Sequence, residues 1–288
     1  MTPTLLFLGT SDSKGVPRLG CECALCQSVR PSARDFRTRA SLLLQATEGT
    51  ILIDTPPEVR LRLAAEHRPA PDALFMTHPH DDHILGFSDV VRSARTMQRP
   101  LPIFAPAEVF TGLRDRFGYL WESPTWSQEA ELTVLEGAIE VAGWRLEAIR
   151  VHHGRNGWAY GYLMERSGWR AGYFSDALHV SDEVLGRWQG LDLLILGANF
   201  WKEEAPLETR SVYDVQEAIT VAQGASVRQL ILTHLSHKIE YATISPLLPS
   251  WASLAWDGRL IQISPIERTN PDEADGTNST SSPDALYP

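Results

Sequence analysis

The chain has 288 residues, of which 43% are hydrophobic and 22% charged, a composition that excludes collagen-like, coiled-coil and wholly disordered proteins. There is no run of roughly 18 uncharged apolar residues, so we expect no membrane span, and the N-terminus lacks the basic region of a signal peptide. A net charge of −10 argues against a protein that grips nucleic acid through a broad basic surface.

Apolar runs separated by turn residues predict an alternation of strands and helices. In chain order, the predicted strands are Thr4–Gly9, Ser41–Ala46, Thr50–Asp54, Ala73–Thr77, Leu101–Ala105, Ile139–Val151, Trp158–Glu165, Arg170–Ser175, Leu191–Gly197, Arg228–Thr233 and Leu260–Ile263. Helical patterns fall at Pro57–His67, Pro106–Leu120, Ser181–Gln189 and Ser211–Gln223. This alternation predicts an α/β fold in which helices cover the sheets, although periodicity alone does not establish how the layers stack.

Residues 1–263 are predicted to form one folded unit. From residue 264 the sequence becomes rich in Pro, Ser, Thr, Asn and Asp, with five acidic residues and one basic residue, hence a charge of −4. Such a segment buries too little apolar surface to offset the entropy lost on ordering. We therefore expect residues 264–288 to be a disordered acidic tail.

A dense group of metal-binding side chains follows the strand predicted to end at Thr77. His78, His80, Asp82 and His83 fall within six residues. Imidazole nitrogen and carboxylate oxygen are ligands for Zn²⁺ and similar divalent ions. In a loop leaving a strand, His78 and His80 can share one ion while Asp82 and His83 turn toward a second, which predicts a pair of adjacent ions.

Further candidate ligands stand at the ends of other predicted strands. Two adjacent ions need a bridging anion, for which Asp176 is the best candidate, and each ion needs one more imidazole. His152 or His153 could supply one of these imidazoles and His234 the other. Because loops at the carboxyl ends of α/β strands gather into a site, we expect these side chains to converge.

The three cysteines form a Cys-x-Cys-x2-Cys motif. Cys21, Cys23 and Cys26 are too close in sequence for comfortable pairwise disulfides but suit one tetrahedral zinc ion, for which His237 is the obvious fourth ligand. A Cys3His site is closed to substrate and therefore structural. Sustained thiolate ligation predicts a reducing, cytoplasmic location.

The motif His-x-His-x-Asp-His at 78–83 resembles the signature of the metallo-β-lactamase superfamily of hydrolases, and the resemblance covers nearly the whole chain before the tail. It implies a four-layer αβ/βα sandwich with Asp54 and Thr77 as supports behind the ligands. His153 is preferred over His152 because Gly154 follows it and because strand alternation favours it. The implied ligands are His78, His80 and His153 on one ion, Asp82, His83 and His234 on the other, and Asp176 between them.

The cysteine motif, together with Leu8-Gly-Thr and Thr233-His-Leu-Ser-His237, resembles the branch containing the phosphoribosyl cyclic phosphate phosphodiesterase of phosphonate breakdown. The B proteins of pyrroloquinoline quinone biosynthesis share part of this pattern. The phosphodiesterase branch carries a histidine, a general acid for the leaving group, where Phe200 or Val212 stands here. Lys202, Tyr213 or a metal-bound water could substitute for it.

These motifs predict a phosphodiesterase with two active-site ions (Zn, Mn or Fe) and one structural Zn, in which a hydroxide between the ions attacks a small phosphodiester, such as a cyclic phosphate. Asp82 and Asp176 are the predicted catalytic carboxylates. The candidates for binding the anionic substrate are Arg37, Arg39, Arg155 and Lys202.

Several alternatives stay open from the sequence. The chain could be a quinone-cofactor biosynthesis protein of type B, or a metal-binding protein that has lost catalysis. A tRNA 3′-processing nuclease is less favoured, because the acidic chain has no evident basic arm for RNA. The sequence favours neither a monomer nor a homodimer.

Overall fold

A computed structural model describes residues 1–264, so the predicted tail lies, apart from its first residue, outside the described residues. The strands are β1 (Thr4–Gly9), β2 (Ser41–Ala46), β3 (Gly49–Ile53), β4 (Ala73–Phe75), β5 (Leu101–Ala105), β6 (Ala130–Val134), β7 (Ile139–Val141), β8 (Trp144–His152), β9 (Trp158–Arg166), β10 (Trp169–Phe174), β11 (Leu193–Gly197), β12 (Leu230–Thr233), β13 (Ala252–Leu254) and β14 (Leu260–Gln262). The α-helices are α1 (Ala24–Ser28), α2 (Val59–Ala65), α3 (Asp81–Ile84), α4 (Phe87–Met97), α5 (Ala107–Trp121), α6 (Trp126–Glu129), α7 (Asp182–Trp188), α8 (Val215–Gly224) and α9 (Tyr241–Ile244).

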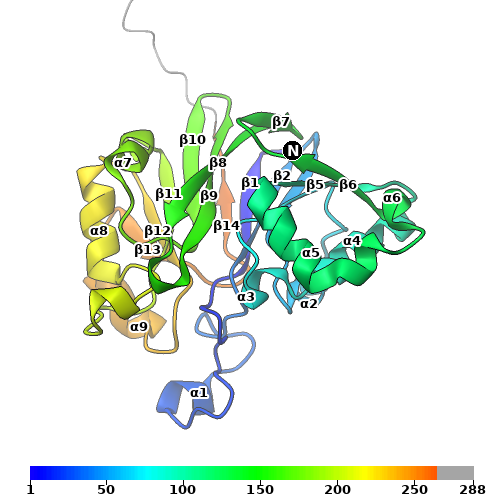
Figure 1. The fold of residues 1–288 in the computed structure, drawn as a ribbon. Helices are drawn as coiled ribbons and strands as arrows, with labels where there is room; N and C mark the ends of the chain where they lie inside the picture. The colour runs from blue at the N-terminus through cyan, green and yellow to red at the C-terminus, as the bar shows by residue number, and fades with distance from the viewer. Residues whose placement is uncertain (265–288) are drawn as a thin grey trace, which may run out of the picture.

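Two seven-stranded sheets form the centre of the molecule. Their strand orders are β14-β1-β2-β3-β4-β5-β6 and β13-β12-β11-β10-β9-β8-β7. Each sheet is mixed: β3 to β6 pair in parallel in the first, and β10 to β13 pair in parallel in the second. The two sheets pack face to face, with α7 and α8 on the outer face of one and α4 and α5 on the outer face of the other (Figure 1).

Three hydrophobic cores correspond to the three interfaces of a four-layer sandwich. One lies between the sheets and includes Phe7, Phe75 and Tyr162. A second packs the outer face of the first sheet against α2, α4 and α5, and a third packs α7 and α8 on the second sheet around Trp188. Burial on both faces explains why central strands such as β1 read as continuous apolar runs. The predicted αβ/βα sandwich is confirmed.

The predicted element order was wrong in several places. The single strand predicted over Ile139–Val151 is a hairpin of β7 and β8, because Ala142 and Gly143 both take positive φ values, +48° and +75°, which make a tight turn. Helix α4 was missed, although Phe87, Val90, Val91 and Ala94 form its buried stripe at helical spacing. Strand β6, on the edge of its sheet, was also missed.

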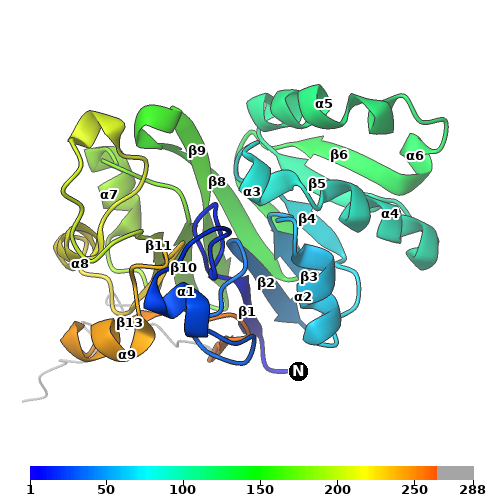
Figure 2. The same ribbon diagram turned by 90° about the horizontal axis from the view of Figure 1, so that it is seen from below.

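The cysteine-bearing segment, residues 10–39, runs from the end of β1 to the start of β2 and carries only α1 as a helix (Figures 1 and 2). It projects from the edge of the two sheets where strands β1, β11 and β12 end. None of the described helices is long and apolar enough to cross a membrane.

Candidate metal centre and its cavity

Loops leaving four strands bring the seven predicted metal ligands together. His78 and His80 follow β4, and α3 then carries Asp82 and His83. The remaining ligands lie within two residues of the ends of β8, β10 and β12, so both sheets contribute. They are His153, Asp176 and His234.

The ligand atoms form two groups of three. Within each group they lie within 4.8 Å of one another: His78, His80 and His153 make one, and Asp82, His83 and His234 make the other. His153, which is 2% exposed, and not the exposed His152, belongs to the first group. The grouping is the same as the ligand division that the sequence resemblance implies.

Asp176 lies between the two groups. Its carboxylate oxygens are 3.2 Å from His83 Nε2, 3.3 Å from His234 Nε2 and 3.6 Å from His153 Nε2. Close packing of strand ends makes this approach possible, because a Cβ at Gly197 would lie 1.8 Å from the carbonyl oxygen of Ser175. Asp176 is therefore placed to contact an ion in either group.

Several buried ligand atoms make no hydrogen bond among the described residues and approach only the other ligands of the centre. His78 Nε2, His83 Nε2, His234 Nε2 and Asp176 Oδ2 make no hydrogen bond. A buried polar atom without a partner is costly, and metal coordination would satisfy all four at once. The residues therefore fit a pair of divalent ions.

Hydrogen bonds behind the ligands fix the rings so that Nε2 faces the centre. Asp54 Oδ2 lies 2.7 Å from His83 Nδ1, and it accepts a hydrogen bond from the Thr77 hydroxyl at 2.7 Å. The same hydroxyl lies 2.9 Å from His78 Nδ1. Asp54 has a φ of +64°, which is unusual for a residue with a side chain and is typical of strained positions at functional sites.

Two further supports were not predicted from the sequence. Asn199 Oδ1 lies 3.0 Å from His234 Nδ1, and the carbonyl oxygen of Ser211 lies 2.8 Å from His153 Nδ1. Asn199 stands two residues beyond the end of β11, which is the one signal that could have indicated it. The Ser211 contact uses only backbone, so its residue type carries no signal. Metal-binding histidines ordinarily have such partners.

Burial and charge set the protonation of the centre. Burial lowers the pKa of His78 well below its usual value, which leaves the imidazole neutral, as a metal ligand must be. Burial opposes ionisation of Asp176, but His234 and His83 outweigh it and hold the pKa of this carboxyl well below its usual value. Burial also opposes protonation of His83 and His234, but Asp176 and Asp82 raise the pKa of both imidazoles, so divalent ions would displace protons from these two ligands on binding.

A cavity of about 300 Å³ opens over the metal centre. Besides His80, Asp82, His153, Asp176 and His234, its lining includes Asp12, Lys14, Arg18, Asn156, Phe200, Glu203, Arg210 and Val212. Phe200 and Val212, the two candidate positions for the missing general acid, thus stand at the cavity wall. The Tyr213 hydroxyl instead accepts a hydrogen bond from the Val180 N–H at 3.0 Å and is not part of this lining.

The four predicted substrate-binding cations do not line this cavity. Arg37 is fully buried, pairs with Asp35 at 2.5 Å and donates to the carbonyl oxygen of Ser236 at 3.2 Å. Arg39 pairs with Glu58. Arg37 and Arg39 both border a neighbouring groove, whereas Arg155 and Lys202 line neither this groove nor the cavity.

The cysteine group forms a separate cluster. The three sulfur atoms of Cys21, Cys23 and Cys26 lie 3.3, 3.5 and 3.4 Å from His237 Nδ1. All four ligand atoms lie within 4.8 Å of one another, which fits a tetrahedral zinc ion with no position left for substrate.

Fold and ligand groups together define a metallo-β-lactamase-type hydrolase scaffold. A family model described as "Beta-lactamase superfamily domain" matches residues 49–235, so the chain belongs to this superfamily. A solved structure of "a New Diphosphatase from the PhnP Family" is 29% identical, with a TM-score of 0.80 over 91% of this chain and 98% of that one.

Two curated relatives bear other names. An octanoyltransferase of Porphyromonas gingivalis is 28% identical over 242 residues, 81% of this chain; the match covers only 46% of that protein's length. A coenzyme PQQ synthesis protein B of Rhodopseudomonas palustris is 27% identical over 230 residues, which cover 69% of this chain and 74% of that protein. The names of the relatives therefore do not agree on one reaction.

Proposed function

We propose that the protein is a dinuclear metal-dependent hydrolase of a small phosphodiester, in the broad sense of a phosphorus atom with two ester or anhydride substituents. The observation that carries this proposal is the pair of ligand triads joined by Asp176 under a cavity with cationic residues at its wall. Two neighbouring cations favour phosphoryl chemistry, in which negative charge builds up on the oxygens around phosphorus.

The side chains of the site would have three roles: holding the ions, orienting the ligands and restricting water. His78, His80 and His153 would hold one ion, Asp82, His83 and His234 the other, and Asp176 both. When bound, such a pair of ions makes water nucleophilic at neutral pH and polarises the phosphoryl group. Asp54 and Asn199 keep His83 and His234 in the required orientation, and Phe200 and Val212 restrict water on one wall of the cavity.

The residues of the cavity wall indicate which leaving group the site can accept. Apart from the metal-ligand candidates, no histidine lines the cavity in the described part of the chain. An alkoxide leaving group needs a proton from a general acid, whereas phosphate, the leaving group of a diphosphate, departs without one at neutral pH. The wall thus favours a diphosphate diester, in agreement with the diphosphatase that is 29% identical to this chain.

A cyclic phosphate is the second candidate substrate. It is supported by the sequence resemblance to the phosphodiesterase branch. For this substrate an alkoxide must leave, so a water molecule would have to supply the proton. We also propose that the cysteine cluster holds zinc and that its reduced thiolates reflect a cytoplasmic location.

A substrate panel tests the proposal. Purified protein loaded with zinc or with manganese is assayed on a dinucleoside diphosphate, on bis(p-nitrophenyl) phosphate and on nucleoside and sugar cyclic phosphates. We expect turnover of the first two, whose leaving groups need no acid, and slow turnover of the third. Preferential hydrolysis of cyclic phosphates would overturn the leaving-group argument. Inactivity on the whole panel by fully metal-loaded protein would overturn the proposed function and favour quinone-cofactor biosynthesis or a non-catalytic metal-binding role.

A further inference from the structure

We propose that Lys14 and Arg18 form a second anion-binding subsite beside the metal centre, which takes a second phosphate group of the substrate. This inference rests on the proposed function, since the reacting phosphate is placed at the metal ligands. Nothing in the sequence patterns indicated these two residues, which lie between the strand β1 and the cysteine motif.

A turn around Asp12 holds the two cations in place. The Asp12 carboxylate, 5% exposed as a residue, accepts the backbone N–H of Lys14 at 3.1 Å and Nη2 of Arg18 at 2.7 Å. The carbonyl oxygen of Asp12 accepts the N–H of Gly15 at 3.2 Å, and Gly15 takes a φ of +71° that a side chain would disfavour. Asp12 itself is tied to the β12 end through the Leu235 carbonyl at 3.2 Å. The turn is therefore anchored to the loop that carries His234.

The cations at this turn keep hydrogen-bonding capacity that other nearby cations have used. The Lys14 side chain is exposed, and its ammonium forms no ion pair within residues 1–264. Arg18 pairs with Asp12 through Nη2 alone, and its side chain is 22% exposed. By contrast, Arg210 in the same cavity is 7% exposed and gives both Nη atoms to Glu217, and Arg39 in the groove pairs with Glu58. Lys14 and Arg18 are thus the cations of this cavity that keep exposed donors for a ligand.

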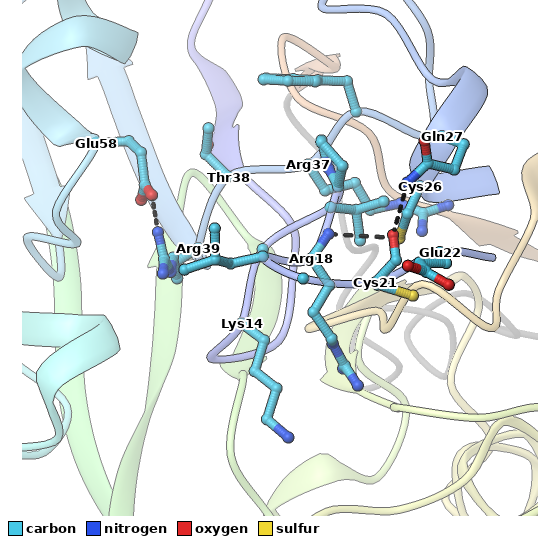
Figure 3. Close-up of a pocket in the computed structure, with 16 residues that line it drawn as sticks. Lys14, Arg18, Cys21, Glu22, Cys26, Gln27, Arg37, Thr38, Arg39 and Glu58 are labelled. Atoms are coloured by element: carbon cyan, nitrogen blue, oxygen red, sulfur yellow. Dashed lines mark hydrogen bonds and ion pairs between the residues drawn. The ribbon is translucent and has the colours of Figure 1, made fainter. Parts of the chain in front are cut away.

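Both residues stand where two cavities meet. They line the 300 Å³ cavity over the metal centre and also a neighbouring groove of about 670 Å³, which Phe36, Arg37 and Arg39 border as well. In Figure 3 the Lys14 and Arg18 side chains extend to the same side of the loop, away from the Arg39–Glu58 pair. A ligand that reaches from the metal centre into the groove must pass these two cations.

The chemistry of the pair selects the ligand class. A lysine ammonium offers three donors and an arginine guanidinium a planar fork, a combination suited to phosphate oxygens. A substrate with a single phosphate would occupy only the metal centre. A substrate with two phosphates, such as a diphosphate diester, would occupy both positions and place its remaining group in the groove. The subsite therefore selects for substrates with two phosphate groups.

Substitution of Lys14 tests the subsite with two substrates. We expect Lys14→Gln to lower kcat/KM for a dinucleoside diphosphate about 10-fold to 100-fold, as loss of a charge-assisted hydrogen bond does. For bis(p-nitrophenyl) phosphate, which has one phosphate, the change should stay below about 3-fold. Lys14→Arg should retain most of the preference. Arg114→Gln, which removes an exposed cation of α5 outside the cavity, is the matched control.

Three outcomes of these assays would overturn the subsite. The first is an equal loss of kcat/KM on both substrates, which would place Lys14 at the reacting phosphate. The second is no loss of kcat/KM on either substrate. The third is the same loss of kcat/KM in Arg114→Gln.

Binding provides a readout that does not depend on turnover. Isothermal titration calorimetry of zinc-loaded protein compares AMP with ADP, which differ by one phosphate. We expect the wild type to bind ADP more tightly than AMP and Lys14→Gln to lose most of that difference. Inactive protein that still shows this pattern would overturn the proposed function but not the subsite. A Lys14→Gln variant that keeps the full ADP preference would overturn the subsite even if the enzyme is active.

Discussion

The two groups of metal-binding residues differ in how the chain builds them. The histidine and aspartate ligands come from the ends of four strands in two sheets, are mostly buried, and have hydrogen-bonded supports behind them. Three of the four ligands of the cysteine cluster come from six consecutive residues of a loop that projects from the layers. The first group opens onto a cavity and the second is closed. Substitution of a ligand in the first group should therefore remove activity, and substitution of a ligand in the second should lower the stability of the fold.

The largest expected effect is that of Asp176→Asn. The amide keeps the shape of the side chain but loses the charge that faces both ligand groups, so we expect kcat to fall roughly 10,000-fold. Because the strands around it are unchanged, the variant should keep the wild-type fold, which circular dichroism checks. Asp115→Asn, at an exposed position of α5, is the matched control. An Asp176→Asn variant with near-normal kcat at full metal content would show that the ligand triads do not form the catalytic centre.

Cys23→Ser should lower stability and leave kcat nearly unchanged. Serine is a poor zinc ligand, so metal analysis should show about three ions per chain in the wild type and about two in the variant. Loss of a structural metal ligand should lower the free energy of unfolding by about 4 kcal/mol, measured by denaturant titration. The kcat of the folded variant should stay within about 3-fold of wild type. Unchanged zinc content, or loss of kcat as severe as in Asp176→Asn, would remove the distinction between the two clusters.

Local patterns in the sequence predicted the parts of the fold whose cause is local. Strands β1, β2 and β5 were predicted with the bounds they have, because each is a short apolar run bounded by turn residues or proline. The β7–β8 turn was missed because Ala142 is an unusual residue for a positive φ. The stacking of the sheets came from the family resemblance, since burial patterns do not state which faces meet.

Within the site, too, features with a local cause were predicted and features that depend on tertiary structure were not. Both clusters of candidate metal ligands were expected from the sequence, because the short motifs at 78–83 and 21–26 are typical of metal binding and the family resemblance supplied the ligands that lie far from them in the chain. The cationic residues were not, because an arginine in sequence looks alike whether it binds phosphate or a neighbouring acid. Arg37 is buried against Asp35, whereas Lys14 faces the cavity, and only the tertiary structure separates the two cases.

Asp257 holds the two ends of the cysteine-bearing segment and predicts a pH effect on stability. It accepts hydrogen bonds from Thr10 at 2.8 Å and from the N–H and hydroxyl of Thr38 at 2.8 and 2.7 Å, so it contacts both ends of the cysteine-bearing segment. Burial raises the pKa of Asp257 from 3.8 to about 6. Between these values the native state binds more protons than the unfolded state, so the contribution of this carboxyl to stability falls as pH rises and stays lost above about 6.

Asp257→Asn removes this titration. The free energy of unfolding of the variant minus that of the wild type should therefore rise by about 2 kcal/mol between pH 4 and pH 7, when measured by denaturant titration at several pH values. Protonation of the metal ligands affects both proteins and cancels in the difference. A difference that does not change with pH would show that Asp257 titrates normally.

The smallest expected effect concerns Asn199, which was not predicted as a site residue. Its Oδ1 contacts His234 Nδ1, so Asn199→Leu should leave the ring in place by packing but without its hydrogen-bonded orientation. We expect a loss of about 10-fold to 100-fold in affinity for one of the two active-site ions, measured by chelator competition, with a parallel loss in kcat/KM. Asn199→Asp keeps an acceptor at the same position and should restore most of both quantities. Equal behaviour of the leucine and aspartate variants would mean that the side chain only fills space, and zinc release from the cysteine cluster in either variant would mean that the two metal regions are not independent.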